Sequence, residues 1–136
     1  MKKILFLLLF IIISCSKNYH FPFSELSYEE FLLLKTNKIK MIDFYNNQCE
    51  PCIDFQKKIL NTKEIVDFAN KHLIAIKIDA WDGDSGTNIW ENQYNGDSIP
   101  LIIFLNSNND VIKEVVGKKD KTEFLTILNE VLNRIK

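Results

Sequence analysis

The sequence predicts a single α/β domain in which a central mixed β-sheet, made of two parallel strands and an antiparallel hairpin, is flanked by helices. The chain has 136 residues, a length that suits one hydrophobic core. Segments with helical spacing alternate with short apolar runs in the order α, β, α, β, α, β, β, α. The last two apolar runs enclose a polar turn at 106–110, a spacing typical of an antiparallel hairpin.

The first helix and the first strand have clear local signals. Ser27 and Glu30 form a capping box ahead of helically spaced apolar residues, which predicts a helix over 28–35. The run 39–45 is almost entirely apolar, so it is predicted to be a strand in the centre of the sheet. An apolar helical stripe then continues to about Leu60.

The middle of the chain predicts one crossover. Asn61 signals a fresh helix start, so the second helix is expected to kink or restart there and to continue over 63–72. The alternating segment 73–79 follows as a second strand, parallel to the first because a helical crossover joins them. The acidic loop 80–86 lacks the ligand spacing of a calcium loop and is expected to be solvated. A short helix is predicted over 88–94.

The last third predicts the hairpin and a closing helix. The strands are expected at 100–105 and 111–116, with Pro100 at the start of its strand, where a missing N–H is tolerated. Asp120 with Glu123 caps a final helix. Its apolar residues recur at 3.6-residue spacing and are Phe124, Leu128, Val131 and Ile135.

The N-terminus predicts export. Two lysines precede the apolar run 4–13, which is too short for a hydrocarbon core that needs about 20 residues but suits a signal peptide. Ser14-Cys15 follows, and this segment resembles the bacterial lipobox. We therefore predict a lipoprotein signal peptide at 1–14, a lipidated Cys15 and tether at 15–26, and a domain at 27–136. The alternative is an ordinary signal peptide with a chance cysteine.

Export and lipidation predict the location and the use of the cysteines. The protein is expected to be anchored by lipid to a bacterial membrane, facing the periplasm or the exterior. Lipidation of Cys15 also accounts for the odd member of three cysteines in an exported chain. The near-neutral formal charge of −1 gives no sign of the clustered basic face that a nucleic-acid partner requires.

The most informative stretch is Cys49-Glu50-Pro51-Cys52, which directly follows the first strand. Cysteines at i and i+3 of a helix lie on one face, with Cα atoms in the range that a disulfide tolerates. Cys49 at the first turn would face unsatisfied N–H groups and the positive end of the helix dipole, which lowers a thiol pKa. Pro51 is tolerated in that turn because its missing N–H would have no partner there.

This stretch, together with Asp43 six residues before Cys49, resembles the active-site segment of the thioredoxin family. Later residues match other positions of the family: a lysine near the buried acid, a cis-proline facing the cysteine pair and a late glycine. In this sequence they are Lys77, Ile99-Pro100 and Gly117. The resemblance covers about 27–135. Phe55 and Lys57 make it most similar to the periplasm-facing C-terminal domain of transmembrane thiol-disulfide interchange reductases.

The resemblance implies a thioredoxin fold and a thiol–disulfide oxidoreductase. Cys49 would be the nucleophile and Cys52 the resolving thiol, with Asp43 and Lys77 handling protons. The substrate would contact Ile99, Pro100, Glu50 and Pro51. No cofactor and no metal are expected. The expected partners are exported protein disulfides and an upstream thiol protein that donates electrons, and we expect a monomer.

Two departures from the family pattern bear on the surface that contacts the partner, and a third bears on the direction of the reaction. Gln48 stands where an aromatic residue often precedes the first cysteine, and Leu101 where a threonine often follows the proline. Glu50 places a carboxylate beside the thiolate, which opposes its ionisation. We therefore predict a Cys49 pKa near that of thioredoxin and a reductase or electron relay.

Other functions remain open from sequence alone. Within the same chemistry the protein could be a disulfide oxidase or isomerase. In another class, the cysteines could belong to a copper-binding module, although two sulfurs without a third ligand make a closed zinc site a poor fit. A thioredoxin-shaped scaffold with idle cysteines is the third option. His72 ends a helix that feeds the second strand, so we expect it to lie away from Cys49.

Overall fold

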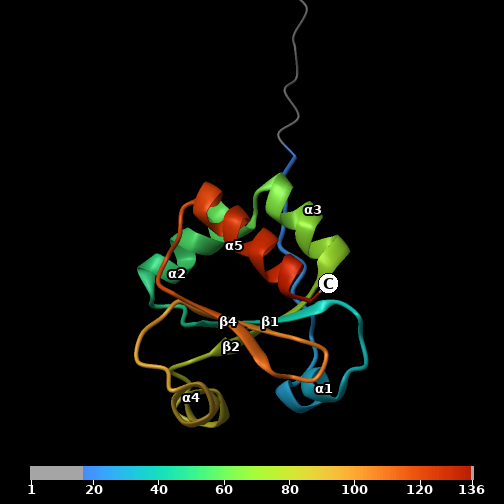
Figure 1. The fold of residues 1–136 in the computed structure, drawn as a ribbon. Helices are drawn as coiled ribbons and strands as arrows, with labels where there is room; N and C mark the ends of the chain where they lie inside the picture. The colour runs from blue at the N-terminus through green and yellow to red at the C-terminus, as the bar shows by residue number, and fades with distance from the viewer. Residues whose placement is uncertain (1–16, 136) are drawn as a thin grey trace, which may run out of the picture.

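The computed structural model describes residues 17–135, and its elements follow the predicted order around one four-stranded sheet (Figure 1). Two helices continue without a break into short π-helical segments, labelled η1 and η2. The elements are α1 (Tyr28–Leu33), β1 (Ile39–Tyr45), α2 (Glu50–Phe55), η1 (Gln56–Leu60), α3 (Lys63–His72), β2 (Leu73–Asp79), α4 (Ser85–Asn88), η2 (Ile89–Gln93), β3 (Leu101–Leu105), β4 (Val111–Val116) and α5 (Lys121–Arg134).

The sheet has the order β2-β1-β3-β4, with β1 parallel to β2 and antiparallel to β3. The hairpin β3–β4 completes the predicted mixed sheet. Because β1 lies between two neighbours, its polar residue Asp43 has no open edge; its partners across the strands are Lys77 and Ile102. The central position of β1 follows from its apolar sequence.

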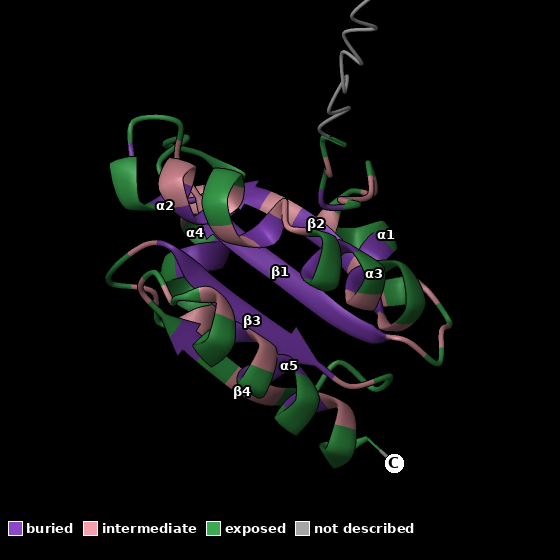
Figure 2. Ribbon diagram, turned by 90° about the horizontal axis from the view of Figure 1, so that it is seen from above, coloured by how far each residue is buried: buried purple, intermediate pink, exposed green. Residues whose placement is uncertain are grey.

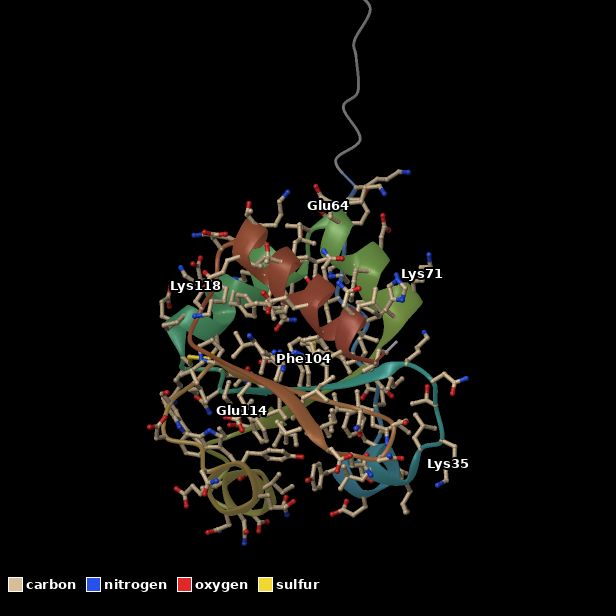
Figure 3. All side chains as sticks on the ribbon, viewed as in Figure 1. Lys35, Glu64, Lys71, Phe104, Glu114 and Lys118 are labelled. Carbon is tan, nitrogen blue, oxygen red and sulfur yellow. A yellow bond between two sulfur atoms is a disulfide. The ribbon has the colours of Figure 1, made fainter. Side chains whose placement is uncertain are left out.

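The strands alternate between two cores, one on each face of the sheet. Figure 1 shows α2, α3 and α5 over one face and α1 and α4 over the other, and Figure 2 shows that β1 and β3 are buried along their length. The strand residues on the α2 face are Ile39, Met41, Leu73, Ala75, Ile102, Phe104 and Val115. Residues of one strand alternate between faces, so Asp43 and Lys77 also belong to the face that α2 covers. Figure 3 shows Phe104 between the sheet and α5.

The segment before α1 is packed rather than free from Phe21 onward. Phe21 is only 6% exposed and belongs to the core under α3 and α5. Its N–H donates to Asn61 Oδ1 at 2.9 Å, and Phe23 pairs with Ala75 at the edge of β2. The expected tether therefore gives way to the packed domain at about Phe21 instead of Ser27. The sequence signal for this packing was the presence of aromatic residues in a segment that has no helical or strand periodicity.

This packing yields a stability prediction. Replacing Phe21 by alanine should lower the free energy of unfolding by about 3 kcal/mol, since a buried aromatic side chain leaves a cavity. Denaturant unfolding of the variant measures the loss. His20→Ala is the matched control, because the neighbouring side chain is exposed and its removal should change stability by less than about 0.5 kcal/mol. Equal stabilities of the Phe21 and His20 variants would contradict the packed N-terminal segment.

The helix after β2 begins three residues earlier than the sequence predicts, because the acidic loop organises its start. The Asp82 carboxylate accepts hydrogen bonds from the backbone N–H groups of Asp84, Gly86 and Thr87 and from the Thr87 hydroxyl. These bonds lower the Asp82 pKa to about 2. Asp82 thus stabilises its own loop, where the sequence had indicated only solvation.

The predicted signal peptide and the lipidated Cys15 lie outside the described residues. Within residues 17–135, every helix is too short or too polar to cross a bilayer.

Candidate active site

The two cysteines are joined by a disulfide at the start of α2. Their Cα atoms are 5.3 Å apart, and both side chains are 6% exposed. Cys49 is the N-cap of the helix, and its Sγ accepts a hydrogen bond from the Cys52 N–H at 3.2 Å. Pro51 lies in the first turn, as predicted. Figure 3 shows the disulfide in yellow at the same end of the sheet as the labelled Lys118.

The turn that delivers Cys49 is organised by Asn46. The Asn46 backbone carbonyl accepts from the Cys49 N–H at 3.1 Å, and its Oδ1 accepts from the Gln48 N–H at 2.8 Å. Its Nδ2 donates to Asp79 Oδ1 at 2.9 Å, which ties the turn to the end of β2. Sequence reasoning missed this residue. Its signal was an asparagine directly after a strand, where such side chains bond the backbone two residues on.

The Ile99–Pro100 peptide is cis, as the resemblance implied, and it lies beside Cys49. The Ile99 carbonyl oxygen is 3.9 Å from Cys49 Sγ. The next carbonyl, that of Pro100, accepts a hydrogen bond from the Gly117 N–H at 2.8 Å. Gly117 has a φ of 77°, a conformation that favours glycine. The late glycine therefore supports the proline loop through its backbone.

Asp43 is buried beneath α2. It is 3% exposed, and its Oδ1 has no hydrogen-bond partner. Burial raises the Asp43 pKa to about 7, while the charge of Lys77 acts in the opposite direction. Because β1 is paired on both sides, Asp43 is not a solvated residue at the edge of the sheet. A carboxyl group with this pKa can both accept and release a proton near neutral pH.

Lys77 is the cross-strand neighbour of Asp43, yet its ammonium is directed elsewhere. Lys77 Nζ donates to Gln56 Oε1. It lies 3.9 Å from the centroid of the Tyr45 ring and 5.2 Å from that of Phe23. Burial lowers the Lys77 pKa, and Asp43 opposes that effect. Sequence reasoning placed Lys77 near the acid correctly but missed both Gln56 and Tyr45.

A cleft of about 280 Å³ joins these groups to the second cysteine. It is lined by Tyr45, Asn47, Cys52, Ile53, Gln56, Lys57, Asn61 and Lys77. The cleft brings Cys52 together with the polar side chains of Gln56 and Lys77. Cys49 instead faces the proline loop, so the two sulfurs have different surroundings.

The remaining predicted residues are placed as follows. Glu50 and Pro51 are exposed at the start of α2, next to Cys49. His72 packs against Phe68 and ends α3 directly before β2, at the end of the sheet opposite the disulfide, as expected. Between residues 17 and 135, no cluster of three or more His, Cys, Asp or Glu side chains could hold a metal ion.

This chain resembles known thioredoxin-like proteins in sequence and in structure. Residues 32–132 match the family model of a thioredoxin-like domain. Curated protein sequences give no match. A proposed disulphide isomerase from Bacteroides thetaiotaomicron has 25% identity and a TM-score of 0.72, with 86% of this chain and 97% of that chain covered.

Two further structures show the same fold at lower identity. The DsbH oxidoreductase has 19% identity and a TM-score of 0.67, covering 84% of this chain and 85% of its own. A thioredoxin from Thermus thermophilus has 18% identity and a TM-score of 0.68, covering 84% and 86%. The fold predicted from sequence is therefore confirmed.

Proposed function

This chain belongs to the thioredoxin-like domain family, and from that membership we propose that it is a membrane-tethered thiol–disulfide oxidoreductase that reduces disulfides of exported proteins. The observation that carries the proposal is the Cys49–Cys52 pair at a helix start, with the buried Asp43 beneath the same helix. The redox fold and its cysteine pair are properties of the family. The reducing direction and the tether are specific to our proposal.

The reaction transfers two electrons from the cysteine pair to the substrate. The Cys49 thiolate attacks one sulfur of a substrate disulfide, and the other sulfur leaves as a thiolate. The Cys52 thiol gives its proton to Asp43, directly or through water, and the resulting thiolate attacks Cys49 Sγ. This step breaks the mixed disulfide, forms the Cys49–Cys52 disulfide and releases the second substrate sulfur. Two thiols of an upstream donor protein then reduce the pair again.

Glu50 supports the reducing direction. Its carboxylate beside Cys49 opposes ionisation of the thiol, which offsets the stabilisation that the helix start gives a thiolate. A less stable thiolate makes the reduced protein a stronger reductant. We expect a Cys49 pKa of about 7 and a reduction potential of about −270 mV, the values of thioredoxin.

Titration of the thiolate absorbance and equilibration with glutathione measure these two quantities. Glu50→Gln is a matched variant that removes only the charge, and it should lower the Cys49 pKa and raise the potential. A wild-type pKa near 4 with a potential of about −120 mV would contradict a reductase and would indicate an oxidase.

Isomerase activity is the second candidate, because the similar Bacteroides protein carries that name. An isomerase requires a pair whose potential is higher, about −180 mV. Recovery of activity from scrambled ribonuclease, measured beside insulin reduction, separates the two activities. A reductase should reduce insulin with little recovery of scrambled ribonuclease.

The tether places this chemistry near a membrane. We propose lipidation at Cys15, which leaves residues 16–20 as the link to the packed Phe21. Five extended residues span about 17 Å, so the active site would stay close to the membrane surface. Metabolic labelling with a fatty acid tests this: Cys15→Ala should lose the label and Cys49→Ala should keep it. Persistent label in the Cys15 variant would contradict the anchor.

A further inference from the structure

Gln56 is one helical turn beyond Cys52, on the same face of the helix, and its side-chain oxygen accepts a hydrogen bond from the Lys77 ammonium. In the paired register, Asp43 and Lys77 are direct neighbours on one face of the sheet. An ion pair between them would be the simple expectation. Among the ion pairs of the described residues, none joins Lys77 to Asp43, and the carboxylate Oδ1 has no hydrogen-bond partner.

The Lys77 ammonium makes three contacts with groups other than Asp43. Gln56 Oε1 accepts its hydrogen bond, and the rings of Tyr45 and Phe23 lie against its ammonium. Aromatic faces attract a cation, and a neutral amide accepts a hydrogen bond from it without adding charge near Asp43. Lys77 is therefore stabilised beside the cleft by groups that leave the buried carboxylate unpaired.

The helix changes form at Gln56. The Asn61 N–H, at the C-cap of η1, donates to the Gln56 carbonyl at 3.0 Å, an i to i+5 bond that spans the π-helical segment. Such π segments occur frequently at functional sites. Here the change occurs at the residue that contacts Lys77, and both residues line the cleft that contains Cys52. Side chains in an open cleft have room to rearrange when one contact is removed.

We propose that Gln56 is a positioning residue: its amide keeps the Lys77 ammonium away from Asp43, so that the carboxylate remains free to take the proton of Cys52. This inference rests on the proposed oxidoreductase function. Gln56 touches neither the substrate nor the reacting sulfurs in this scheme, and it acts through Lys77 alone.

The neighbours of Asp43 define which charges can influence it. Its β3 neighbour Ile102 is apolar, and the α5 side chains over this face are apolar as well. The titratable or charged groups on the strands and helix packed around it are Lys40 and Tyr45 of β1, Lys77 and Asp79 of β2, Cys49 at the N-cap of α2, Glu50, Cys52 and Asp54 of α2, and Lys57 and Lys58 of η1. Lys77 is the cation among them whose charge acts on Asp43.

The test is a direct titration of Asp43 by carbon NMR of the side-chain carboxyl group in the reduced protein. In Gln56→Leu, Lys77 is released toward Asp43, and the Asp43 pKa should fall from about 7 to about 6 or below. In Gln56→Glu, a carboxylate of nearly the same shape binds Lys77 more strongly and adds negative charge, so the Asp43 pKa should rise. The pH midpoint of the Cys52 resolving step should move with it in each variant.

Two controls separate positioning from a general structural effect. In a Lys77→Met background, Gln56→Leu should leave the Asp43 pKa unchanged, because no ammonium remains to be released. Lys57→Met removes a cleft lysine that makes no hydrogen bond or ion pair among the described residues, and it should also leave that pKa unchanged.

The results have distinct consequences. Opposite shifts in the leucine and glutamate variants, absent without Lys77, would support the inference. An unchanged Asp43 pKa in Gln56→Glu, or a leucine shift that persists without Lys77, would overturn it. Because the titration needs no substrate, a wild-type protein unable to reduce insulin would refute the proposed function and still leave the role of Gln56 measurable.

Discussion

Cys49→Ser should reduce the rate of insulin-disulfide reduction by roughly a thousandfold or more, to the level of the chemical reductant alone. A serine hydroxyl stays protonated at neutral pH and cannot form the mixed disulfide on which the reaction depends. Cys49 is the sulfur beside the cis-proline, and its position at the helix start favours its thiolate. No other described cysteine can replace it, because Cys52 lies one turn inside the helix.

Cys15→Ser provides the matched control for this variant. This substitution removes the one cysteine outside the Cys49–Cys52 pair, which precedes the domain in the sequence. The variant should keep full activity in solution. Full activity of the Cys49 variant would contradict the redox proposal and would favour the alternative in which the cysteines bind copper. Measuring copper binding of the same variants would then identify that module.

Asp43→Asn should slow the resolving step by about a hundredfold, the usual range for loss of a general base. Asparagine has the shape of aspartate but cannot accept the Cys52 proton. The effect belongs to resolution and not to the first attack, so mixed disulfide should accumulate during turnover. Rapid-quench trapping of the thiols measures this accumulation. An unchanged resolving rate would remove Asp43 from the mechanism.

The same substitution should stabilise the protein at neutral and alkaline pH. The Asp43 pKa is about 7 in the folded state against 3.8 in the reference state, so between these values the folded state keeps a proton that the unfolded state loses. The free energy of unfolding therefore falls as the pH rises from about 4 to about 7. At about 1.4 kcal/mol per pKa unit, ionised Asp43 costs about 4 kcal/mol above that range.

Denaturant unfolding at pH 4, 6 and 8 measures this dependence. Wild-type protein should lose stability between pH 4 and pH 8 relative to Asp43→Asn, and the two should be similar at pH 4. Asp67→Asn is the control, since that carboxylate is exposed on α3 and should not reproduce the difference. A constant difference between wild type and the Asp43 variant would show that burial does not destabilise this carboxylate.

Local sequence signals predicted most of the fold, because the bounds of these strands and helices depend on apolar patterns and capping residues that are close together in the sequence. The strands at 39–45, 73–79 and 111–116 have the predicted bounds, since their apolar patterns end at polar turns. The helix starts at Ser27 and Asp120 were predicted from capping residues, and both side chains accept the expected backbone hydrogen bonds.

Other features depend on contacts between distant residues, which a local pattern does not contain. The packing of Phe21 needs α3, α5 and Asn61, so a segment without periodicity read as a tether. The direction of the Lys77 ammonium depends on Gln56, which is 21 residues away in sequence. The sequence pattern predicted which residues would lie near the cysteine pair. The contacts between their side chains depend on residues that only the fold brings together.

The most direct test of the central claim is the identity of the cysteine that forms a covalent bond with the substrate. Cys52→Ala protein lacks the resolving thiol, so incubation with a disulfide substrate should accumulate a mixed disulfide. Peptide mapping by mass spectrometry should locate that bond at Cys49. A mixed disulfide located only at Cys15, or none at all under conditions in which the wild-type protein reduces the substrate, would contradict the account.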